Sequence, residues 1–213
     1  MEEEKYEIIH FMLDMETLSV QPCPVIIQLS MVAFEQKSGK VLGDIFNRKV
    51  NARSSVNLSK NFKIDGDTVM FWLEQDTDVY ENVFLPSLKT EYSKEEDIMN
   101  VLIDLKKWMD DKKKQYCRMY DNGKSFIWAN GSDCTWLSQA CLTCKLEVPF
   151  KFYEVQDVRT LVNLCMVLTG QNPKRKVEAR KNKHDSLEDC YVQLDYFMEA
   201  MKMLQSQIQI KKG

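Results

Sequence analysis

The chain opens with three apolar segments separated by short polar stretches. Residues 6–13, 25–34 and 41–50 are rich in Ile, Val, Leu, Met and Phe, and each has the length of a β-strand. The polar segment 37–40, which contains Gly39, predicts a turn between the second and third segments. Consecutive strands joined by short connections usually pair with one another, so this order predicts an antiparallel meander.

From residue 67 onward, helical patterns alternate with short strand-like segments. Asp67 and Thr68 are candidate caps of a helix over 67–83, and Ser93 with Glu96 has the sequence of a capping box. The helix that follows has one apolar stripe, formed by Ile98, Val101, Leu102, Leu105, Trp108 and Met109. The remaining pattern predicts strands at 126–129 and 150–158 and helices at 134–144, 159–168 and 185–206. This order predicts an α/β fold in which helices cover a mixed sheet.

Length and composition are typical of a single globular domain over residues 1–213. Hydrophobic residues make up 44% of the chain and charged residues 29%, the balance of a globular protein rather than a disordered or membrane-embedded one. The acidic start of the chain is unlike a secretory signal, and no apolar run approaches the roughly 20 residues of a membrane span. We therefore expect a cytoplasmic protein with no membrane partner, either a monomer or a homodimer.

The seven cysteines are predicted to be buried free thiols. An odd number in a chain of this length argues against a disulfide framework. Cys141 and Cys144 have the spacing of zinc ligands or of a redox pair, but no second cysteine pair follows and histidine is scarce. The pair lies in a predicted helix, where residues three apart share a face, so packing is the better interpretation.

Acidic residues at the ends of several predicted elements are candidates for one metal site. Asp14 and Glu16 lie two apart at the end of the first strand, so their side chains point the same way. Adjacent carboxylates repel one another unless a cation lies between them, and Mg²⁺ and Mn²⁺ prefer oxygen ligands. Asp133 follows a strand and an Asn-Gly turn, where it could instead cap a helix. Asp189 lies one turn inside the last helix and His184 just before it.

In order and spacing, these residues resemble the motifs of the DEDDh branch of the DnaQ-like 3′→5′ exonucleases. The Asp-x-Glu-Thr motif of that branch matches residues 14–17, its second motif matches Asp133, and its His-x4-Asp motif matches His184 and Asp189. The resemblance covers nearly the whole chain and is greatest to small exonucleases of tailed bacteriophages and their bacterial exoribonuclease relatives. It implies a ribonuclease H-like α/β fold, with three antiparallel strands, then two parallel strands, and flanking helices.

The resemblance also implies the chemistry of the site. Two divalent cations, Mg²⁺ or Mn²⁺, would be held by Asp14, Glu16, Asp133 and Asp189. His184 would act as the general base toward the attacking water, because histidine exchanges protons near neutral pH. This two-metal mechanism would release nucleoside 5′-monophosphates from the 3′ ends of single-stranded DNA or RNA.

Further residues are candidates for holding the terminal nucleotide. The resemblance assigns Met15, Thr17 and Leu18 to this role, through backbone groups and an apolar wedge. Trp72, or its neighbour Phe71, could stack on a base, a contact that is independent of sequence. Because Trp72 lies in a predicted amphipathic helix, packing in the core is the alternative.

Cations on two segments are candidates for phosphate contacts. Arg159 begins a predicted helix, and the cation-rich segment 174–183 starts with Lys174, Arg175 and Lys176. In a chain of net charge −3, a solvated loop is the alternative for this segment. Its position immediately before His184 favours a role near the site.

Two other functions would use many of the same residues. A catalytically silent nucleic-acid-binding relative is expected to have lost ligands, whereas the four carboxylates and the histidine are all present. A two-metal nucleotidase or phosphatase would act on short nucleotides and would release phosphate rather than mononucleotides. For the exonuclease, the expected location is the cytoplasm, which would be the host cytoplasm if a phage encodes the protein.

Overall fold

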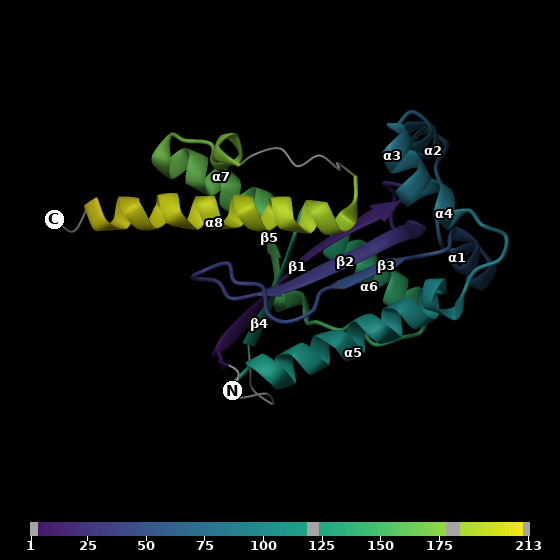
Figure 1. Ribbon diagram of the computed structural model, residues 1–213, viewed down its shortest axis with the longest axis horizontal. Coiled ribbons are helices and arrows are strands. Elements are labelled where there is room, and N and C mark those ends of the chain that lie inside the picture. The colour runs from purple at the N-terminus through teal and green to yellow at the C-terminus, as the bar shows by residue number, and fades with distance from the viewer. Residues whose placement is uncertain (1–3, 119–123, 178–183, 211–213) are drawn as a thin grey trace.

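A mixed β-sheet forms the centre of the molecule. The structure, a computed structural model, describes residues 4–118, 124–177 and 184–210. Within these ranges it has a five-stranded sheet in the order β3-β2-β1-β4-β5 (Figure 1). The strands are β1 (Ile8–Thr17), β2 (Ile26–Phe34), β3 (Phe46–Lys49), β4 (Lys124–Ala129) and β5 (Val155–Asp157). Pairing is antiparallel among β1, β2 and β3 and parallel from β1 through β4 to β5, which confirms the predicted sheet.

Helices cover both faces of the sheet and one of its ends (Figure 1). One face carries α7 (Val158–Thr169) and α8 (Ser186–Ile210), and the other carries α5 (Ile98–Tyr116) and α6 (Asp133–Thr143). Shorter helices gather at the end where β1 finishes: α1 (Ala52–Leu58), α2 (Gly66–Leu73), α3 (Thr77–Val79) and α4 (Leu85–Ser87). None of the helices in the described part of the chain is both long and apolar enough to cross a membrane.

The alternation of side chains along β1 separates the hydrophobic core from the acidic positions. Phe11 and Leu13 point into the larger core cluster, together with residues of α5 and α6, whereas Met12 packs in a second cluster with residues of α7 and α8. Successive side chains of a strand point to opposite faces. Asp14 and Glu16 therefore lie on the Met12 face, toward α8.

Polar side chains of β2 fix the first turn of α8 over the sheet. The hydroxyl groups of Ser30 and Ser186 lie 2.7 Å apart, and the backbone N–H of Ser186 donates to Oε1 of Gln28 at 3.3 Å. Nε2 of Gln28 donates to Asp185, whose other oxygen accepts from the N–H of Leu187 and so caps the helix. Because Gln28, Ser30 and Ser186 are buried and paired, α8 can start over β2 in one register only.

The strands differ in length from the predicted segments. β1 continues to Thr17, so Asp14 and Glu16 lie within the strand rather than after it. The third strand, predicted over 41–50, is shorter because Gly43 adopts a left-handed conformation (φ 70°) and Asp44 turns away to pair with Lys112 at 2.6 Å. The segment 150–158 contributes only β5, since Phe152–Glu154 forms a 3₁₀ turn before it.

The region between β3 and α5 also departs from the prediction. Instead of one helix over 67–83, α2 ends at Leu73, and the chain restarts at Thr77 and passes through a π-helical turn at Tyr80–Phe84. Asp65 caps α2, in place of the expected Asp67 or Thr68. The short helix α1 was not predicted.

All seven cysteines lie in the described ranges, and each is buried and free. Burial raises the pKa of the Cys141 and Cys144 thiols to about 12, so both are neutral thiols at physiological pH. This confirms the interpretation of the cysteines as packing residues.

Candidate active site

β1, α6 and α8 bring the four predicted carboxylates to one end of the sheet. Asp14 and Glu16 come from β1, Asp133 is the first residue of α6, and Asp189 lies in the first turn of α8. Asp14, Asp133 and Asp189 line one cavity of about 440 Å³. Ligand atoms of Glu16, Asp189 and His184 all lie within 4.8 Å of one another. The structure therefore places all five predicted residues in a single cluster.

A tight turn after β4 delivers Asp133 to this cluster. β1 and β4 run parallel, so both strands end at the same edge of the sheet. Gly131 follows β4 with φ 64°, and a Cβ atom there would lie 3.0 Å from the Arg159 guanidinium, so a glycine suits both the backbone and the space. Its N–H donates to Asp157, the cap of α7. The cap position of α6 is Ser132, which leaves the Asp133 carboxylate free to face the cavity.

The carboxylates carry more negative charge than their surroundings can stabilise. Burial, together with the charges of Glu16, Asp133 and Asp189, raises the pKa of Asp14 well above its ordinary value. Burial and the neighbouring carboxylates raise the pKa of Glu16 to about 8. Burial also raises the pKa of Asp133 to about 7, although Arg159 acts in the opposite direction, and it raises the pKa of Asp189. Clustered carboxylates with pKa values raised in this way repel one another, and either a bound cation or protons would relieve the repulsion.

The chemistry of this donor set fits hard divalent cations. The carboxylates of Asp14, Glu16, Asp133 and Asp189 supply oxygen ligands, and the described residues that line the cavity include no cysteine. Mg²⁺ and Mn²⁺ prefer such ligands, and their positive charge would remove the repulsion that raises the pKa values. These four residues could hold the ions.

His184 lies beside the cluster on a left-handed backbone turn (φ 62°) immediately before the cap of α8. Its ring meets Phe71 edge to face, with centroids 5.0 Å apart, and lies 6.3 Å from the Trp72 ring. Aromatic side chains of α2 thus contact the imidazole, and Glu16 of β1 and Asp189 of α8 also lie close to it.

Trp72 packs in the core and does not face a substrate. Its side chain is 1% exposed, its Nε1–H donates to the carbonyl of Thr17 at 2.8 Å, and its ring stacks on Phe84. The predicted stacking of Trp72 on a base is therefore wrong. Phe71, the neighbour offered as the alternative, is 40% exposed and contacts His184.

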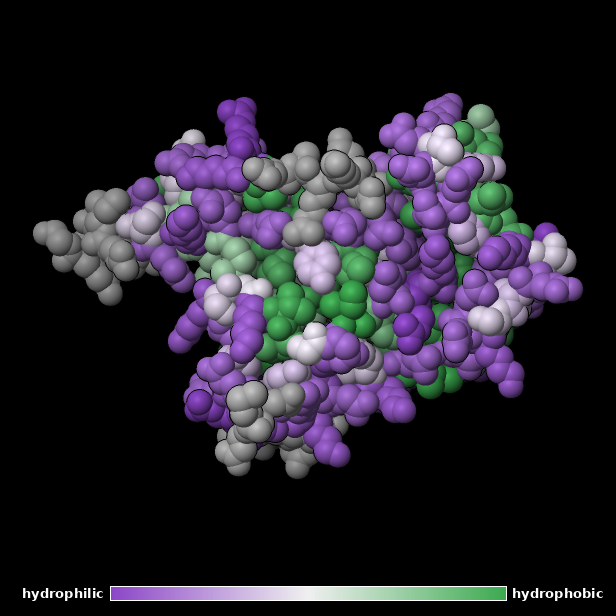
Figure 2. All heavy atoms as spheres, viewed as in Figure 1, coloured by the Kyte–Doolittle hydropathy of each residue, from purple (hydrophilic) through white to green (hydrophobic). Residues whose placement is uncertain are grey.

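The apolar wedge predicted at the end of β1 is also corrected by the structure. Met15 and Leu18 are buried in the core, and Thr17 donates its hydroxyl to the carbonyl of Ser19 at 2.8 Å. The exposed apolar side chains in this region belong instead to the α1–α4 end of the molecule, where hydrophobic surface is visible in Figure 2. On α2 they include Met70, Phe71 and Leu73.

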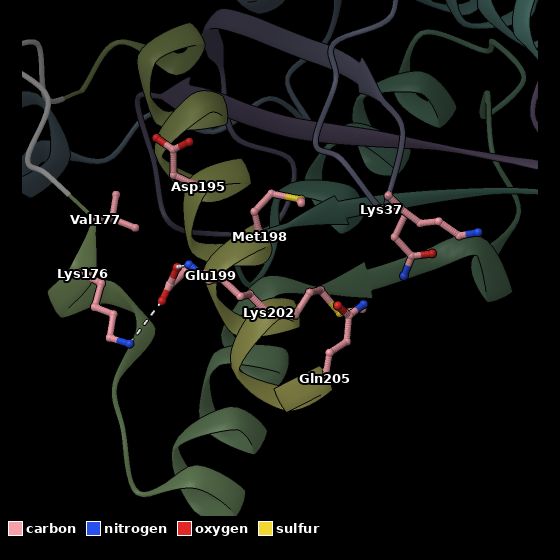
Figure 3. Close-up of a pocket in the computed structure, with 10 residues that line it drawn as sticks. Lys37, Lys176, Val177, Asp195, Met198, Glu199, Lys202 and Gln205 are labelled. Atoms are coloured by element: carbon pink, nitrogen blue, oxygen red, sulfur yellow. Dashed lines mark ion pairs between the residues drawn. The ribbon is translucent and has the colours of Figure 1, made fainter. Parts of the chain in front are cut away.

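The predicted cations point in different directions. Arg159 and Lys174 line the carboxylate cavity, and Nζ of Lys174 lies 5.0 Å from the centroid of the Tyr196 ring. Lys176 points away, into a groove of about 510 Å³ along α8, where it pairs with Glu199 at 3.3 Å (Figure 3). Arg175 is exposed. Residues 178–183 of the predicted basic segment lie outside the described residues.

Gln193 lies one turn after Asp189 on α8 and was not predicted as a site residue. Its Nε2 donates to Oδ1 of Asp14 at 2.5 Å, and both side chains are buried. The helical spacing of four residues was the available signal. Trp136 and Tyr196 also line the cavity and were not predicted there.

Comparison with known protein families identifies the class of domain. The family model described as the Rv2179c-like 3′-5′ exoribonuclease domain matches residues 9–201. The chain belongs to this family. The match includes every carboxylate of the cluster and His184 of this Rv2179c-like domain. No curated protein matches the sequence.

Solved structures share the fold at low sequence identity. Cell-death related nuclease 4 (CRN-4) aligns with a TM-score of 0.61 at 14% identity, over 92% of this chain and 66% of CRN-4, just under two thirds of its length. A 3′-exonuclease described in recognition of the histone mRNA stem-loop aligns with a TM-score of 0.53 at 14% identity, over 96% of this chain and 84% of that one. These likenesses confirm the ribonuclease H-like fold of the Rv2179c-like domain. None of the comparisons supports the predicted resemblance to bacteriophage exonucleases.

The raised pKa of Glu16 predicts how the metal-free protein responds to pH. Its value of about 8 in the folded state exceeds the ordinary value of 4.5, so the folded state binds the proton more tightly than the unfolded state. This tighter proton binding stabilises the folded state. Its contribution is complete below pH 4.5 and is lost as the pH rises toward 8. In chelator, melting temperatures should therefore fall over this range, and added Mg²⁺ should raise them most at the alkaline end.

Glu16→Ala should flatten this pH dependence and leave the melting temperature in chelator at pH 8 unchanged or several degrees higher. One kcal/mol shifts the melting temperature of a domain this size by about 2–4 °C. Glu147→Ala, at an exposed position, is the matched control and should change neither property. A large fall in the melting temperature of Glu16→Ala would show that Glu16 is a structural residue instead.

Proposed function

We propose that this Rv2179c-like domain hydrolyses single-stranded RNA from the 3′ end and releases nucleoside 5′-monophosphates. The observation that carries the proposal is the convergence of four carboxylates at one end of the sheet. Asp14, Asp133 and Asp189 line one cavity, and Glu16 and His184 lie beside Asp189. Membership of an exoribonuclease family favours RNA over DNA as the substrate.

The residues of the chain would divide the work. Asp14, Glu16, Asp133 and Asp189 would hold two divalent cations, which supply charge neutralisation at the scissile phosphate and activation of water. His184 would accept the proton of the attacking water, with its ring held in place by the edge contact with Phe71. These groups would act on the scissile phosphate and the attacking water and would make no sequence-specific contact with a nucleobase. The enzyme would therefore degrade strands of any sequence.

Two surfaces next to the carboxylates would hold the strand. The exposed ring of Phe71 would stack on a base, a contact worth about 1–3 kcal/mol. On the other side of the cavity, Arg159 and Lys174 present cations to the phosphates, and Lys174 is positioned by the Tyr196 ring. The phosphate groups would thus meet positive charge on the way to the carboxylates, which would otherwise repel them.

The direct test offers the protein single-stranded RNA and DNA of one sequence, labelled at either end, with Mg²⁺, Mn²⁺ or chelator. We expect stepwise shortening of 5′-labelled RNA, mononucleotides from 3′-labelled RNA, slower cleavage of DNA and no cleavage in chelator. Release of phosphate from mononucleotides, with long strands left intact, would indicate the nucleotidase alternative. Binding of the strand with no cleavage in either Mg²⁺ or Mn²⁺ would indicate the catalytically silent nucleic-acid-binding relative.

Variants of His184 and Asp189 should separate proton transfer from metal binding. His184→Ala should lower the cleavage rate by about 10²–10⁴-fold, the range for loss of one positioned base, with little change in the metal concentration that gives half-maximal rate. Asp189→Asn should raise that metal concentration, so excess Mn²⁺ should partly restore its activity. Rates measured against Mn²⁺ concentration test this division. Rescue of His184→Ala by metal, without rescue of Asp189→Asn, would mean that the two roles are assigned wrongly.

Lys174 and Lys176 provide a matched pair for testing the strand path. Lys174→Ala should weaken the binding of single-stranded RNA and reduce the slope of log affinity against log salt by about 0.7, the value for one phosphate contact on a single strand. Lys176→Ala should leave the slope unchanged, because Lys176 points into the other groove and pairs with Glu199. Binding would be measured with an uncleaved complex in Ca²⁺ or chelator. Equal effects of the two variants would show that the strand does not follow the cavity wall at Lys174.

A further inference from the structure

α8 contributes two polar side chains to the carboxylate cavity, Asp189 and, one turn later, Gln193. Residues four apart in a helix lie on the same face, so both side chains reach toward β1. Gln193 is 2% exposed, and its Nε2 donates a short hydrogen bond to Oδ1 of Asp14. Asp14 interacts with Glu16, Asp133 and Asp189, so a contact that fixes its orientation bears on the whole cluster.

The hydrogen bond also fixes the orientation of the Gln193 amide. Nε2 of Gln193 donates to Asp14, so the carbonyl oxygen faces elsewhere. A carboxylate that binds a cation is ionised and only accepts hydrogen bonds, so metal binding by Asp14 would keep the amide in this orientation. Oε1 of Gln193 is buried and has no hydrogen-bond partner among the described residues. Buried acceptors in folded proteins are nearly always paired. Because Gln193 and Asp14 both line the cavity, the missing donor is to be sought in what binds there.

The chemistry of the cavity limits what this donor can be. A divalent cation has no proton to donate, and the oxygens of a phosphodiester only accept. Mg²⁺ in protein sites keeps several water molecules, and each of these water molecules is a donor. A ribose hydroxyl group of the substrate is the other possible source of an O–H donor at this place.

We propose that Gln193 is a positioning residue that prepares Asp14 for metal binding. Its amide nitrogen holds the carboxylate in one orientation through Oδ1 and leaves Oδ2 free for the ions. Its carbonyl oxygen accepts a hydrogen bond from a water molecule in the hydration shell of a bound ion. This inference rests on the proposed metal-dependent function, and it adds a residue outside the four carboxylates and the histidine to the machinery of the site.

The test replaces Gln193 by methionine, which has a similar length but lacks both the donor and the acceptor. Calorimetric titration with Mn²⁺, in the absence of nucleic acid, should show affinity about 10–100-fold weaker in Gln193→Met, the range for loss of a group that orients a metal ligand. The rate at low Mn²⁺ should fall by a similar factor and recover with excess Mn²⁺, while KM for RNA stays within twofold. Gln205→Met, on the same helix but in the groove away from the carboxylates, should match the unmodified protein in every assay.

This experiment distinguishes failure of the inference about Gln193 from failure of the proposed nuclease function. Mn²⁺ affinity of Gln193→Met within twofold of the unmodified protein would overturn the inference, even if the protein cleaves RNA. A raised KM for RNA with unchanged Mn²⁺ affinity would also overturn it and would assign Oε1 to a ribose hydroxyl. A protein whose Mn²⁺ affinity depends on Gln193 but which cleaves no strand would contradict the nuclease proposal and leave this inference standing.

A measurement on the unmodified protein covers the case in which Gln193→Met does not fold. The side-chain amide protons of Gln193, observed by NMR, should be shifted downfield and slow to exchange, as expected for a buried hydrogen bond to a carboxylate. Their resonances should move on addition of Mg²⁺. Amide protons that exchange as fast as those of Gln205, or that do not respond to Mg²⁺, would overturn the inference.

Discussion

Repulsion among buried carboxylates is the constraint around which this end of the molecule is organised. Taking a carboxylate out of water disfavours its ionised form, and bringing others close to it adds to the penalty. Asp14 experiences both effects, since it is buried and interacts with Glu16, Asp133 and Asp189. Such a cluster persists only if packing elsewhere holds its members in place. A bound cation would relieve this repulsion, so binding of metal would recover part of the free energy that the repulsion costs in the folded state.

The packing that resists this repulsion is supplied by β1 and by the start of α8. β1 is buried on both faces, between the two hydrophobic clusters, and cannot shift without exposing them. α8 is fixed by paired polar groups, with Ser30 against Ser186 and Gln28 against both Ser186 and Asp185. Hydrogen bonds of this kind require a defined geometry, whereas apolar contacts tolerate sliding. The position of Asp189 opposite Asp14 is therefore set by β2, a strand that carries none of the predicted ligands.

The parts of the fold and site that could be predicted are those that local sequence determines. The alternation along β1 places Asp14 and Glu16 on one face wherever the strand ends, and the order of strands and helices gives the parallel pairing that brings Asp133 to the same edge. Whether Phe71 or Trp72 is buried depends on how α2 is rotated against the core, and the local sequence does not determine this rotation. Core packing of Trp72 was one of two alternatives predicted, and its contacts with Thr17 and Phe84 show that this alternative is correct. The helical spacing places Gln193 on the same face as Asp189, but its contact with Asp14 is made across the fold and is not determined by the local sequence.

The same reasoning explains the position of His184. Its backbone lies in the left-handed region, which costs free energy for a residue with a side chain, although histidine is among the residues found there more often than most. The conformation turns the chain sharply before Asp185 caps α8, and it directs the imidazole back toward α2. An extended backbone at this position would carry the ring away from Phe71 and from Glu16. The contact between the rings of His184 and Phe71 therefore offsets part of the strain, and it links the helix that holds Asp189 to the exposed apolar end of the molecule. The orientation of His184, the proposed general base, thus depends on Phe71, the ring on which we propose that the terminal nucleotide stacks.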